Sequence, residues 1–328
     1  MKQTVTVLGD GAWGTALATL LAHNGHQVNL WCYNSAVAQS ISTRQENSFY
    51  LPGITLSSTI IATTDFKQAF TNTTAIFEAI PVKHMRSVLT ACASYAPKNI
   101  PWVILSKGIE QKTLLLPSEL IQEIIKPSPT CVVLAGPSFA RDLAQQKTTA
   151  CTIAGDKAVA SQIQALVHTA YFTTEYSTDL KGVQLASAFK NCIALGVGLL
   201  EGAGYGDNTQ ALFLTLMIKE LALLLEHNQA DSQTMWKLAG IGDIVLTAYS
   251  NQSRNRALGQ KLGAGNNLSI CINKLSTVPE SFNTLQSIIQ LQSRDSLLLP
   301  LCTILYQCIF EHVPLAELVS SLTKCIRS

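Results

Sequence analysis

The chain has 328 residues, of which 47% are hydrophobic and 13% are charged, and its formal net charge is +2. Its length favours about two domains, and its low share of charged residues disfavours intrinsic disorder and a coiled coil. The 23 basic and 21 acidic residues form no basic block, which argues against nucleic-acid binding.

The first 180 residues alternate between strand-like and helix-like segments. Apolar, β-branched segments predict strands, and segments with helical periodicity predict the helices between them. The predicted strands are 4–8, 27–32, 75–80, 102–105, 131–134, 150–154 and 171–176, and the clearest helices are 15–23, 85–94 and 114–125. This alternation predicts a mostly parallel sheet covered by helices on both faces, as in a Rossmann-like α/β domain.

The pattern changes near Asp179, after which helical periodicity dominates. The clearest helices of the second half are 183–200, 208–227, 251–262 and 297–312. We therefore expect a dinucleotide-binding Rossmann-like domain over 1–180 and an all-helical substrate-binding and catalytic domain over 181–328. The apolar segment 183–200 contains Lys190 and Asn191, so we expect a buried helix and no membrane span.

A glycine motif, G-x-G-x-x-G, follows the first predicted strand and opens the first predicted helix. Gly9 permits the tight turn, Gly11 lets a pyrophosphate approach the backbone, and Gly14 lets the helix pack closely on the strand. In this strand–loop–helix context the motif predicts a dinucleotide site, whereas a plain glycine turn is the alternative.

The end of the second strand bears on the choice between NAD and NADP. An acidic residue usually binds the ribose 2′-hydroxyl here. The strand ends instead in Trp31-Cys32-Tyr33-Asn34, and Arg44 is the nearest arginine. The missing carboxylate removes a source of repulsion, so the sequence favours NADPH while allowing NADH.

Polar residues of the second half are candidates for chemistry. Lys190 lies between Ala186 and Ala194 on one helix face, which favours burial over the usual solvated lysine. Burial lowers a lysine pKa and makes the side chain a usable general acid or base. Asp243 is either a partner of Lys190 or an ordinary helix-capping residue.

Three further segments are candidates for binding anions or other ligands. The cluster 251–256, NQSRNR, suits a small anion at a helix start, although a solvated helix end would look similar. The loops 106–108 and 136–140 follow predicted strands, where open α/β sheets bind ligands. A surface turn is the alternative for each loop.

Seven segments of the chain form a recognisable series. In order they are GDGAWGTALA (9–18), SKG (106–108), GPSFA (136–140), GVQLASAFKNCIALGVG (182–198), GIGDIVLT (240–247), NQSRNR (251–256) and VPESFNT (278–284). Together they resemble the bacterial NAD(P)-dependent glycerol-3-phosphate dehydrogenases. The resemblance extends over nearly the whole chain. It implies reversible reduction of dihydroxyacetone phosphate to sn-glycerol 3-phosphate, which supplies phospholipid synthesis.

The resemblance also implies roles for individual residues. Lys190 would be the catalytic proton donor and acceptor, assisted by Asp243 and Lys107. The cofactor would be bound by Gly9, Gly11, Ala12, Trp13, Gly14, Tyr33, Lys107, Ala140, Arg254, Val278 and Glu280. The substrate would be bound by Lys107, Gly136, Ser138, Lys190, Asp243, Ser253, Arg254 and Asn255.

The chain departs from the family pattern at three positions. Asp10 stands where the family usually has alanine, Ser281 where it usually has glycine, and Asn34 where an acidic or basic residue is common. These departures bear on cofactor affinity and preference and leave the reaction class unchanged.

Two other classes of function remain as alternatives. One is another two-domain hydroxyacid or sugar-acid dehydrogenase with a helix-borne lysine, and the other is a catalytically silent dinucleotide-binding regulator. Nine cysteines without a C-x-x-C pair predict reduced thiols in a cytoplasmic protein, and six histidines without metal spacing predict no metal site. The resemblance suggests a homodimer.

Overall fold

The computed structural model describes residues 2–273 and 279–327. The chain forms two compact units: Met1–Ser106 with Pro117–Leu180, and Lys107–Leu116 with Lys181–Ser328. The chain therefore passes to the second unit for ten residues before it returns to the first.

The first unit is built on one eight-stranded sheet with the order β3-β2-β1-β4-β5-β6-β7-β8. The strands are β1 (Thr4–Leu8), β2 (Gln27–Trp31), β3 (Ile60–Thr63), β4 (Ile76–Glu78), β5 (Trp102–Ile104), β6 (Cys131–Ala135), β7 (Thr149–Gly155) and β8 (Phe172–Ser177). Strands β1 to β6 are parallel, and β7 and β8 run antiparallel to them. This confirms the Rossmann-like, mostly parallel sheet.

One strand, β3, was absent from the predicted set. Its sequence, IIAT, gives the burial pattern of an edge strand, with Ile61 exposed. An edge strand of four residues lacks the continuous apolar pattern that identifies the central strands of a parallel sheet.

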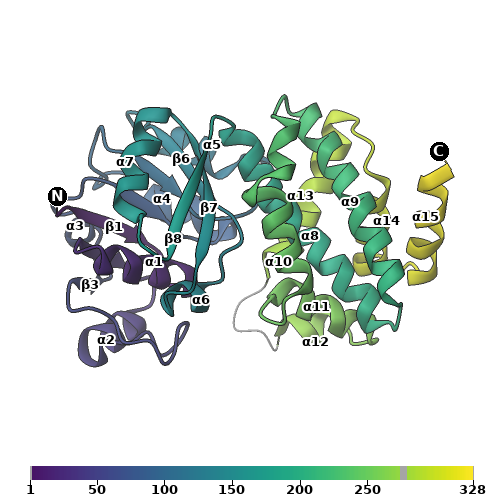
Figure 1. Cartoon of the computed structure of the whole chain (residues 1–328), viewed down its shortest axis with the longest axis horizontal. Coiled ribbons are helices and arrows are strands. Elements are labelled where there is room, and N and C mark those ends of the chain that lie inside the picture. The colour runs from purple at the N-terminus through teal and green to yellow at the C-terminus, as the bar shows by residue number, and fades with distance from the viewer. Residues whose placement is uncertain (1, 274–278, 328) are drawn as a thin grey trace. The chain divides into compact units, whose positions relative to one another are not determined.

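Helices cover this sheet (Figure 1). They are α1 (Ala12–His23), α2 (Ser35–Arg44), α3 (Phe66–Ala69), α4 (Val82–Cys92), α5 (Pro117–Ile124), α6 (Ala140–Ala144) and α7 (Lys157–Val167). Val5 and Val7 of β1 pack with Leu17 and Leu21 of α1 in the core of the unit. This packing fixes the start of α1 at the end of β1.

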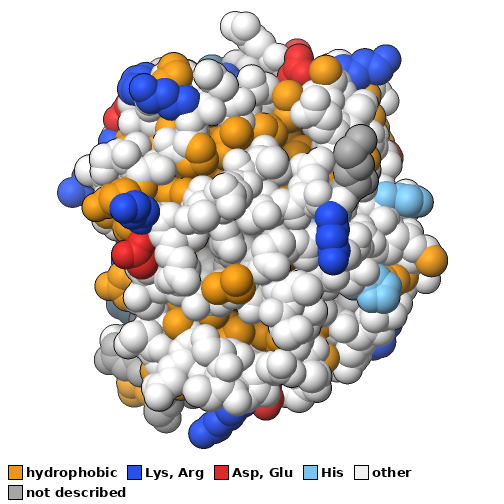
Figure 2. Space-filling view, turned by 90° about the vertical axis from the view of Figure 1, so that its left-hand side faces the viewer, with side chains coloured by type: hydrophobic (Ala, Val, Ile, Leu, Met, Phe, Trp, Pro, Cys, Tyr) orange, Lys and Arg blue, Asp and Glu red, His pale blue; other side chains and the backbone are white. Residues whose placement is uncertain are grey.

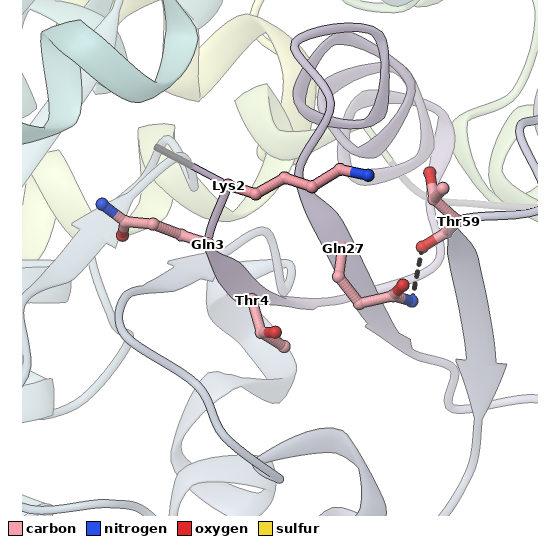
Figure 3. A pocket seen from close by; sticks show the side chains of 5 residues that line it. All are labelled: Lys2, Gln3, Thr4, Gln27 and Thr59. Atoms are coloured by element: carbon pink, nitrogen blue, oxygen red, sulfur yellow. Dashed lines mark hydrogen bonds between the residues drawn. The ribbon is translucent and has the colours of Figure 1, made fainter.

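The strand order reverses at β1, which lies between β2 and β4. Ligands of open α/β sheets bind at the carboxyl ends of the strands beside such a reversal, which here is the end of β1. A shallow hollow at the amino ends is lined by Lys2, Gln3, Thr4, Gln27 and Thr59 (Figure 3). It lies at the wrong end of the strands for such a ligand, and Gln27 Nε2 there donates to the Thr59 carbonyl at 2.7 Å.

The second unit is helical (Figure 1). Its helices are α8 (Leu180–Gly202), α9 (Asp207–His227), α10 (Asp243–Tyr249), α11 (Arg254–Gly263), α12 (Leu268–Asn273), α13 (Glu280–Asp295), α14 (Pro300–Phe310) and α15 (Leu315–Arg327), with a 3-10 helix (Ser232–Trp236) and a π-helical turn (Leu238–Gly242) before α10. This confirms the all-helical second part of the chain.

Helix α8 is the buried centre of this unit, because every residue from Gly182 to Leu200 is buried. Among the described residues, α8 and α9 are long and apolar enough to cross a membrane by length and composition. The apolar window of α8 is wholly buried within the protein, as expected of a core helix.

Helices α8 and α11 approach each other so closely that only glycine fits at several contacts. A Cβ atom on Gly198 would lie 2.1 Å from the Arg256 carbonyl oxygen, and one on Gly259 would lie 2.1 Å from the Leu195 carbonyl oxygen. Since such distances are far below van der Waals contact, these glycines set the spacing of α8 and α11.

The segment Lys107–Leu116 belongs to the helical unit, although the sequence assigned it to the first domain. Ile109 and Leu116 are buried in the helical core, and Ser287 Oγ of α13 donates to the Ile109 carbonyl at 3.0 Å. The predicted boundary at 180 missed this excursion because a ten-residue segment carries no compositional change of its own.

Charged side chains on the face shown in Figure 2 are scattered, and basic and acidic groups occur on it without a large patch of either sign. This distribution agrees with the balanced charge of the sequence.

Candidate active site

The glycine loop has the geometry that its sequence predicts. Gly9 has φ +121°, and a Cβ atom on it would lie 2.7 Å from the Ala79 carbonyl oxygen. A Cβ atom on Gly14 would lie 2.1 Å from the Gly9 carbonyl oxygen, so Gly14 permits the close packing of α1 on the loop. At Gly11 no atom lies within 4 Å of the Cβ position, so the backbone there is open to an approaching ligand.

The start of α1 offers donors to that ligand. No side chain caps this end of the helix, whose N-cap residue is Gly11. The first backbone N–H groups of a helix, here those of Ala12 and Trp13, need an outside acceptor, and the helix dipole favours an anion. The indole Nε1 of Trp13 is buried without a hydrogen-bond partner among the described residues. These observations fit the pyrophosphate of a dinucleotide.

The end of β2 lies beside this loop. The N–H of Gly9 donates to the Trp31 carbonyl at 3.1 Å. Tyr33 follows with its side chain 81% exposed, so it presents a ring to solvent on which a ligand could stack. The Asn34 side chain caps α2 by accepting the Ala36 N–H at 2.9 Å.

The loop 136–140, at the carboxyl end of β6, is shaped by close backbone packing. A Cβ atom on Gly136 would lie 2.8 Å from Cys151 Cα, so this glycine is required for the packing of β6 on β7. Ser138 Oγ donates to the Gly136 carbonyl at 3.0 Å, and Ala140 begins α6, which packs on α1. Packing therefore explains Gly136 without a ligand, and the substrate role of Ser138 remains a prediction.

The second unit holds a cluster of two lysines around one carboxylate. Lys190 Nζ of α8 donates to Asp243 Oδ1 at 2.6 Å and to Thr247 Oγ1 at 2.7 Å. Lys107 Nζ donates to Asp243 Oδ2 at 2.7 Å. The Asp243 side chain is 1% exposed, the Lys190 side chain 8% and the Lys107 side chain 19%. The least exposed lysine is therefore held on two sides, while Lys107 retains contact with solvent.

The cluster changes the acidity of its members. Burial lowers the pKa of Lys190 to about 8, and the Asp243 carboxylate opposes that effect. Burial alone would raise the pKa of Asp243, but the charges of Lys107 and Lys190 outweigh it and hold the pKa below its ordinary value. Asp243 is also the first residue of α10, where the helix dipole favours a negative charge. The carboxylate therefore stays ionised, and Lys190 can lose or gain a proton near neutral pH.

The start of α11 adjoins α8 and α13 through one asparagine. Asn255 Nδ2 donates to Asn191 Oδ1 at 2.9 Å, and Asn255 Oδ1 accepts the Ser281 N–H at 3.1 Å. Ser253 caps the helix by accepting the Arg256 N–H at 3.2 Å. Asn191 is the neighbour of Lys190 in sequence, so this network attaches the start of α11 to the lysine-bearing helix.

The two arginines of this segment have different surroundings. Arg256 donates to both carboxylate oxygens of Glu201, at 2.9 and 2.7 Å, and to Asn251 Oδ1 at 2.7 Å. Arg254 is exposed at the start of α11 and makes no hydrogen bond to the described residues. Arg254 is therefore the arginine of this cluster that remains available for an anion.

Glu280 begins α13, and burial raises the pKa of its carboxyl to about 7, with Arg254 acting in the opposite direction. The predicted cofactor contact Val278 lies outside the described residues. The role of Glu280 toward a cofactor remains a prediction.

Comparison with known proteins identifies the family. Residues 4–160 match the family model of the NAD-dependent glycerol-3-phosphate dehydrogenase N-terminus, and residues 179–320 match that of its C-terminus. The chain belongs to the NAD-dependent glycerol-3-phosphate dehydrogenase family.

Relatives in this family align over almost the whole chain. A glycerol-3-phosphate dehydrogenase [NAD(P)+] of Geobacter sp. (strain M21) is 36% identical over 325 residues, which cover 98% of this chain and 97% of that protein. The enzyme of that name from Myxococcus xanthus (strain DK1622) is 38% identical over 305 residues, covering 92% and 91%. The crystal structure of glycerol-3-phosphate dehydrogenase from Coxiella burnetii has a TM-score of 0.94 at 27% identity, covering 98% and 99%.

Three residues that position this dehydrogenase's candidate groups were not singled out from the sequence. Thr247 bonds Lys190, Asn191 bonds Asn255, and Asn47 Nδ2 donates to the Asp10 carbonyl in the glycine loop at 2.8 Å. The four-residue spacing of Asp243 and Thr247 was a usable indication of one helix face. Asn47 is polar and fully buried in a segment without regular periodicity, so the sequence offered no comparable indication.

Proposed function

We propose that this protein catalyses the reversible reduction of dihydroxyacetone phosphate to sn-glycerol 3-phosphate with NADH or NADPH. The observation that supports it most directly is the buried cluster of Lys190, Asp243 and Lys107 in a chain of this family. Such a cluster supplies what a carbonyl reduction needs from a protein: a proton and positive charge beside the developing alkoxide.

Lys190 is the proposed proton donor. An ammonium group has three N–H donors, and two of those of Lys190 donate to Asp243 Oδ1 and Thr247 Oγ1. The remaining N–H is directed by these two bonds and would donate to the substrate carbonyl oxygen. In the reducing direction this proton moves to the oxygen and Lys190 becomes neutral; in the oxidising direction the neutral amine takes the hydroxyl proton.

Lys107 and Asp243 set the charge around that transfer. Two ammonium groups and one carboxylate leave the cluster with a net positive charge, which favours an alkoxide. The Asp243 carboxylate holds both lysines in place, so little reorganisation is needed during the reaction. Lys107, the more exposed of the two, would also contact the substrate.

The start of α11 is the proposed site for the substrate phosphate. Arg254 supplies a charged donor without a competing bond among the described residues, and the helix start adds backbone N–H groups. Ser253 and Asn255 flank it, and Asn255 attaches it to α8. An anchored phosphate would hold the carbonyl carbon in one position, which raises the rate through orientation.

The glycine loop is the proposed cofactor site. The bound nicotinamide would supply the hydride that reduces C2 of the substrate. Gly9, Gly11 and Gly14 shape the loop, and the N–H groups of Ala12 and Trp13 at the start of α1 would bind the pyrophosphate. The family resemblance also implies cofactor contacts for Tyr33 and Ala140 of the first unit, and separately for Arg254 and Glu280 of the second.

The test is the loss of nicotinamide absorbance on mixing the protein with NADH or NADPH and dihydroxyacetone phosphate. The proposal expects turnover that disappears when dihydroxyacetone, which lacks the phosphate, replaces the substrate. Equal turnover of both ketones would reject the phosphate site, and turnover of 2-keto acids instead would favour a hydroxyacid dehydrogenase. Dinucleotide binding without any turnover would favour the silent regulator.

The proposal extends to the setting of the reaction. The product would serve phospholipid synthesis, the protein would act in the cytoplasm, and it would form a homodimer, as its family resemblance suggests. Sedimentation of the purified full chain would report the dimer, because a monomer near 35.4 kDa contradicts that part of the proposal.

A further inference from the structure

Asp10 occupies a place in the first unit that the catalytic proposal does not use. It lies between Gly9 and Gly11, directly after β1, and is 8% exposed. Strands β1 and β2 pair in parallel up to Leu8 and Trp31, and the N–H of Gly9 continues that pairing. Asp10 therefore lies level with the residues that follow β2.

The Asp10 carboxylate turns toward the end of β2. Its Oδ2 accepts the Asn34 N–H at 3.4 Å. Burial raises the pKa of Asp10, and the backbone N–H groups of Asn34 and Tyr33 act in the opposite direction. Burial raises the pKa of the neighbouring Cys32 thiol, and the charge of Asp10 adds to that rise. The hydrogen bond to the Asn34 N–H thus places the Asp10 carboxylate beside residues 32–34.

A buried asparagine also holds the loop around Asp10. Asn47 is fully buried, and its Nδ2 donates to the Asp10 carbonyl and, at 2.8 Å, to Thr15 Oγ1. Thr15 Oγ1 also donates to the Asp10 carbonyl, at 3.3 Å. These hydrogen bonds hold the Asp10 backbone in place, and they therefore restrict the position of its side chain beside the end of β2.

The end of β2 lacks the charged side chains that usually distinguish the two cofactors. In Rossmann domains an acidic residue there binds the ribose 2′-hydroxyl, and an arginine accommodates the 2′-phosphate of NADP. Residues 32–34 contain no carboxylate, and residues 32–43 contain neither lysine nor arginine. The carboxylate beside the end of β2 is instead that of Asp10, which belongs to the glycine loop.

We propose that Asp10 replaces the missing acidic residue of β2 and makes the protein prefer NADH to NADPH. This inference rests on the dinucleotide site of the proposed function, and it reverses the preference that the sequence favoured. Asp10 is a specificity-determining residue in this proposal, and it takes no part in the chemical step.

The preference has two physical causes. An ionised carboxylate can accept about four hydrogen bonds, so the Asp10 carboxylate can accept one from a ribose hydroxyl in addition to those from the backbone N–H groups of Asn34 and Tyr33. A 2′-phosphate would instead meet a carboxylate, and the Asn34 N–H that could have bound it already has an acceptor. Two like charges close to one another repel, and residues 35–43 of α2 provide no cation to offset them.

The experiment measures dissociation constants of NADH and NADPH by nicotinamide fluorescence, using the full chain at mildly alkaline pH. Calorimetric titrations with AMP and adenosine 2′,5′-bisphosphate isolate the effect of the 2′-phosphate. The variants are Asp10→Ala, Asp10→Asn and, as a control, Asp156→Asn. Asp156 caps α7 beyond β7, away from β1 in the sheet order, and asparagine preserves that cap.

The wild-type protein should bind NADH at least about tenfold more tightly than NADPH, which corresponds to about 1.4 kcal/mol. Both Asp10 variants should lose about tenfold of this ratio, and Asp10→Asn should do so by gaining NADPH affinity, because it keeps the side-chain shape and removes the charge. Asp156→Asn should keep the wild-type ratio. A wild-type preference for NADPH, or ratios within about twofold of wild type in both Asp10 variants, would overturn the proposal.

These outcomes are separable from the proposed reaction. Binding ratios that follow Asp10, without turnover of dihydroxyacetone phosphate, would support the specificity and reject the substrate. Turnover of dihydroxyacetone phosphate, with NADH to NADPH binding ratios that are unchanged in the Asp10 variants, would support the substrate and reject the specificity role of Asp10. Melting curves with and without NADH establish that each variant is folded. If the alanine variant does not fold, the asparagine variant decides the test.

Discussion

Lys190 Nζ and Asp243 Oδ1 lie 2.6 Å apart, although 53 residues separate them in the chain. Helix α8 carries the lysine through the centre of the helical unit, and the turn before α10 brings the carboxylate to it. Both side chains are almost fully buried, and Thr247 bonds both. A buried charge is destabilising when its partner of opposite charge is removed. Substitution of either residue should therefore have a measurable effect.

Replacing Lys190 with methionine should lower kcat by about a thousandfold, because it removes the proton donor while filling the same space. Binding of NADH should change little. The matched control is Lys181→Ala, which removes an exposed lysine at the start of the same helix and should leave kcat as in wild type. A methionine variant with kcat within a few-fold of wild type would refute the role of Lys190.

The rate of ketone reduction should fall as the pH rises through about 8, where Lys190 loses its proton. Burial lowers this pKa below that of an ordinary lysine, so Lys190 loses its proton at a lower pH than a lysine in solution would. The reverse reaction needs the neutral amine, so its rate should rise over the same range. Profiles of kcat in both directions check this, and a reduction rate that climbs through this range would contradict it.

Asp243→Asn should move the break in the reduction profile to lower pH, because the Asp243 charge is what raises the Lys190 pKa against burial. The variant should also lose about 3–5 kcal/mol of stability, since the buried Lys190 and the partly buried Lys107 would lose their shared counter-charge. Urea unfolding measures the second effect and pH profiles the first. An unmoved break would show that Asp243 does not control Lys190.

Arg254→Gln should raise KM for dihydroxyacetone phosphate by about 10- to 100-fold, the worth of one charge-assisted hydrogen bond. The control is Arg256→Gln, which breaks the bidentate contact with Glu201 and should mainly lower Tm. Initial rates over a range of substrate concentrations distinguish the two. If Arg256→Gln raised KM more than Arg254→Gln, the phosphate site would be assigned to the wrong arginine.

Gly259→Ala should destabilise the helical unit, because its Cβ atom would lie 2.1 Å from the Leu195 carbonyl oxygen. Separating α8 from α11 costs about 1–3 kcal/mol and lowers Tm by a few degrees. The Asn255–Asn191 bond joins the same two helices, so KM for the substrate should rise as well. Thermal unfolding and KM together check this, and an unchanged Tm would contradict it.

Much of the first unit could be predicted from local patterns. Buried parallel strands are short apolar segments that can be recognised in the sequence. The glycine loop after β1 can be recognised by its motif, because its geometry requires glycine at fixed positions. The edge strand β3 and the excursion of 107–116 into the helical unit escaped prediction. Both lack a local pattern, because an edge strand is half exposed and a ten-residue segment joins a core only through distant partners.

By itself the sequence determined the fold class, the glycine loop and the identity of the candidate groups, because strand and helix periodicities and short motifs are local properties of the chain. Only the tertiary structure decided that Lys107 shares Asp243 with Lys190, that Arg254 and not Arg256 is available, and that Asp10 reaches the end of β2. Each of these depends on contacts between residues far apart in the chain. Such contacts follow from how helices and strands pack, which no local periodicity specifies.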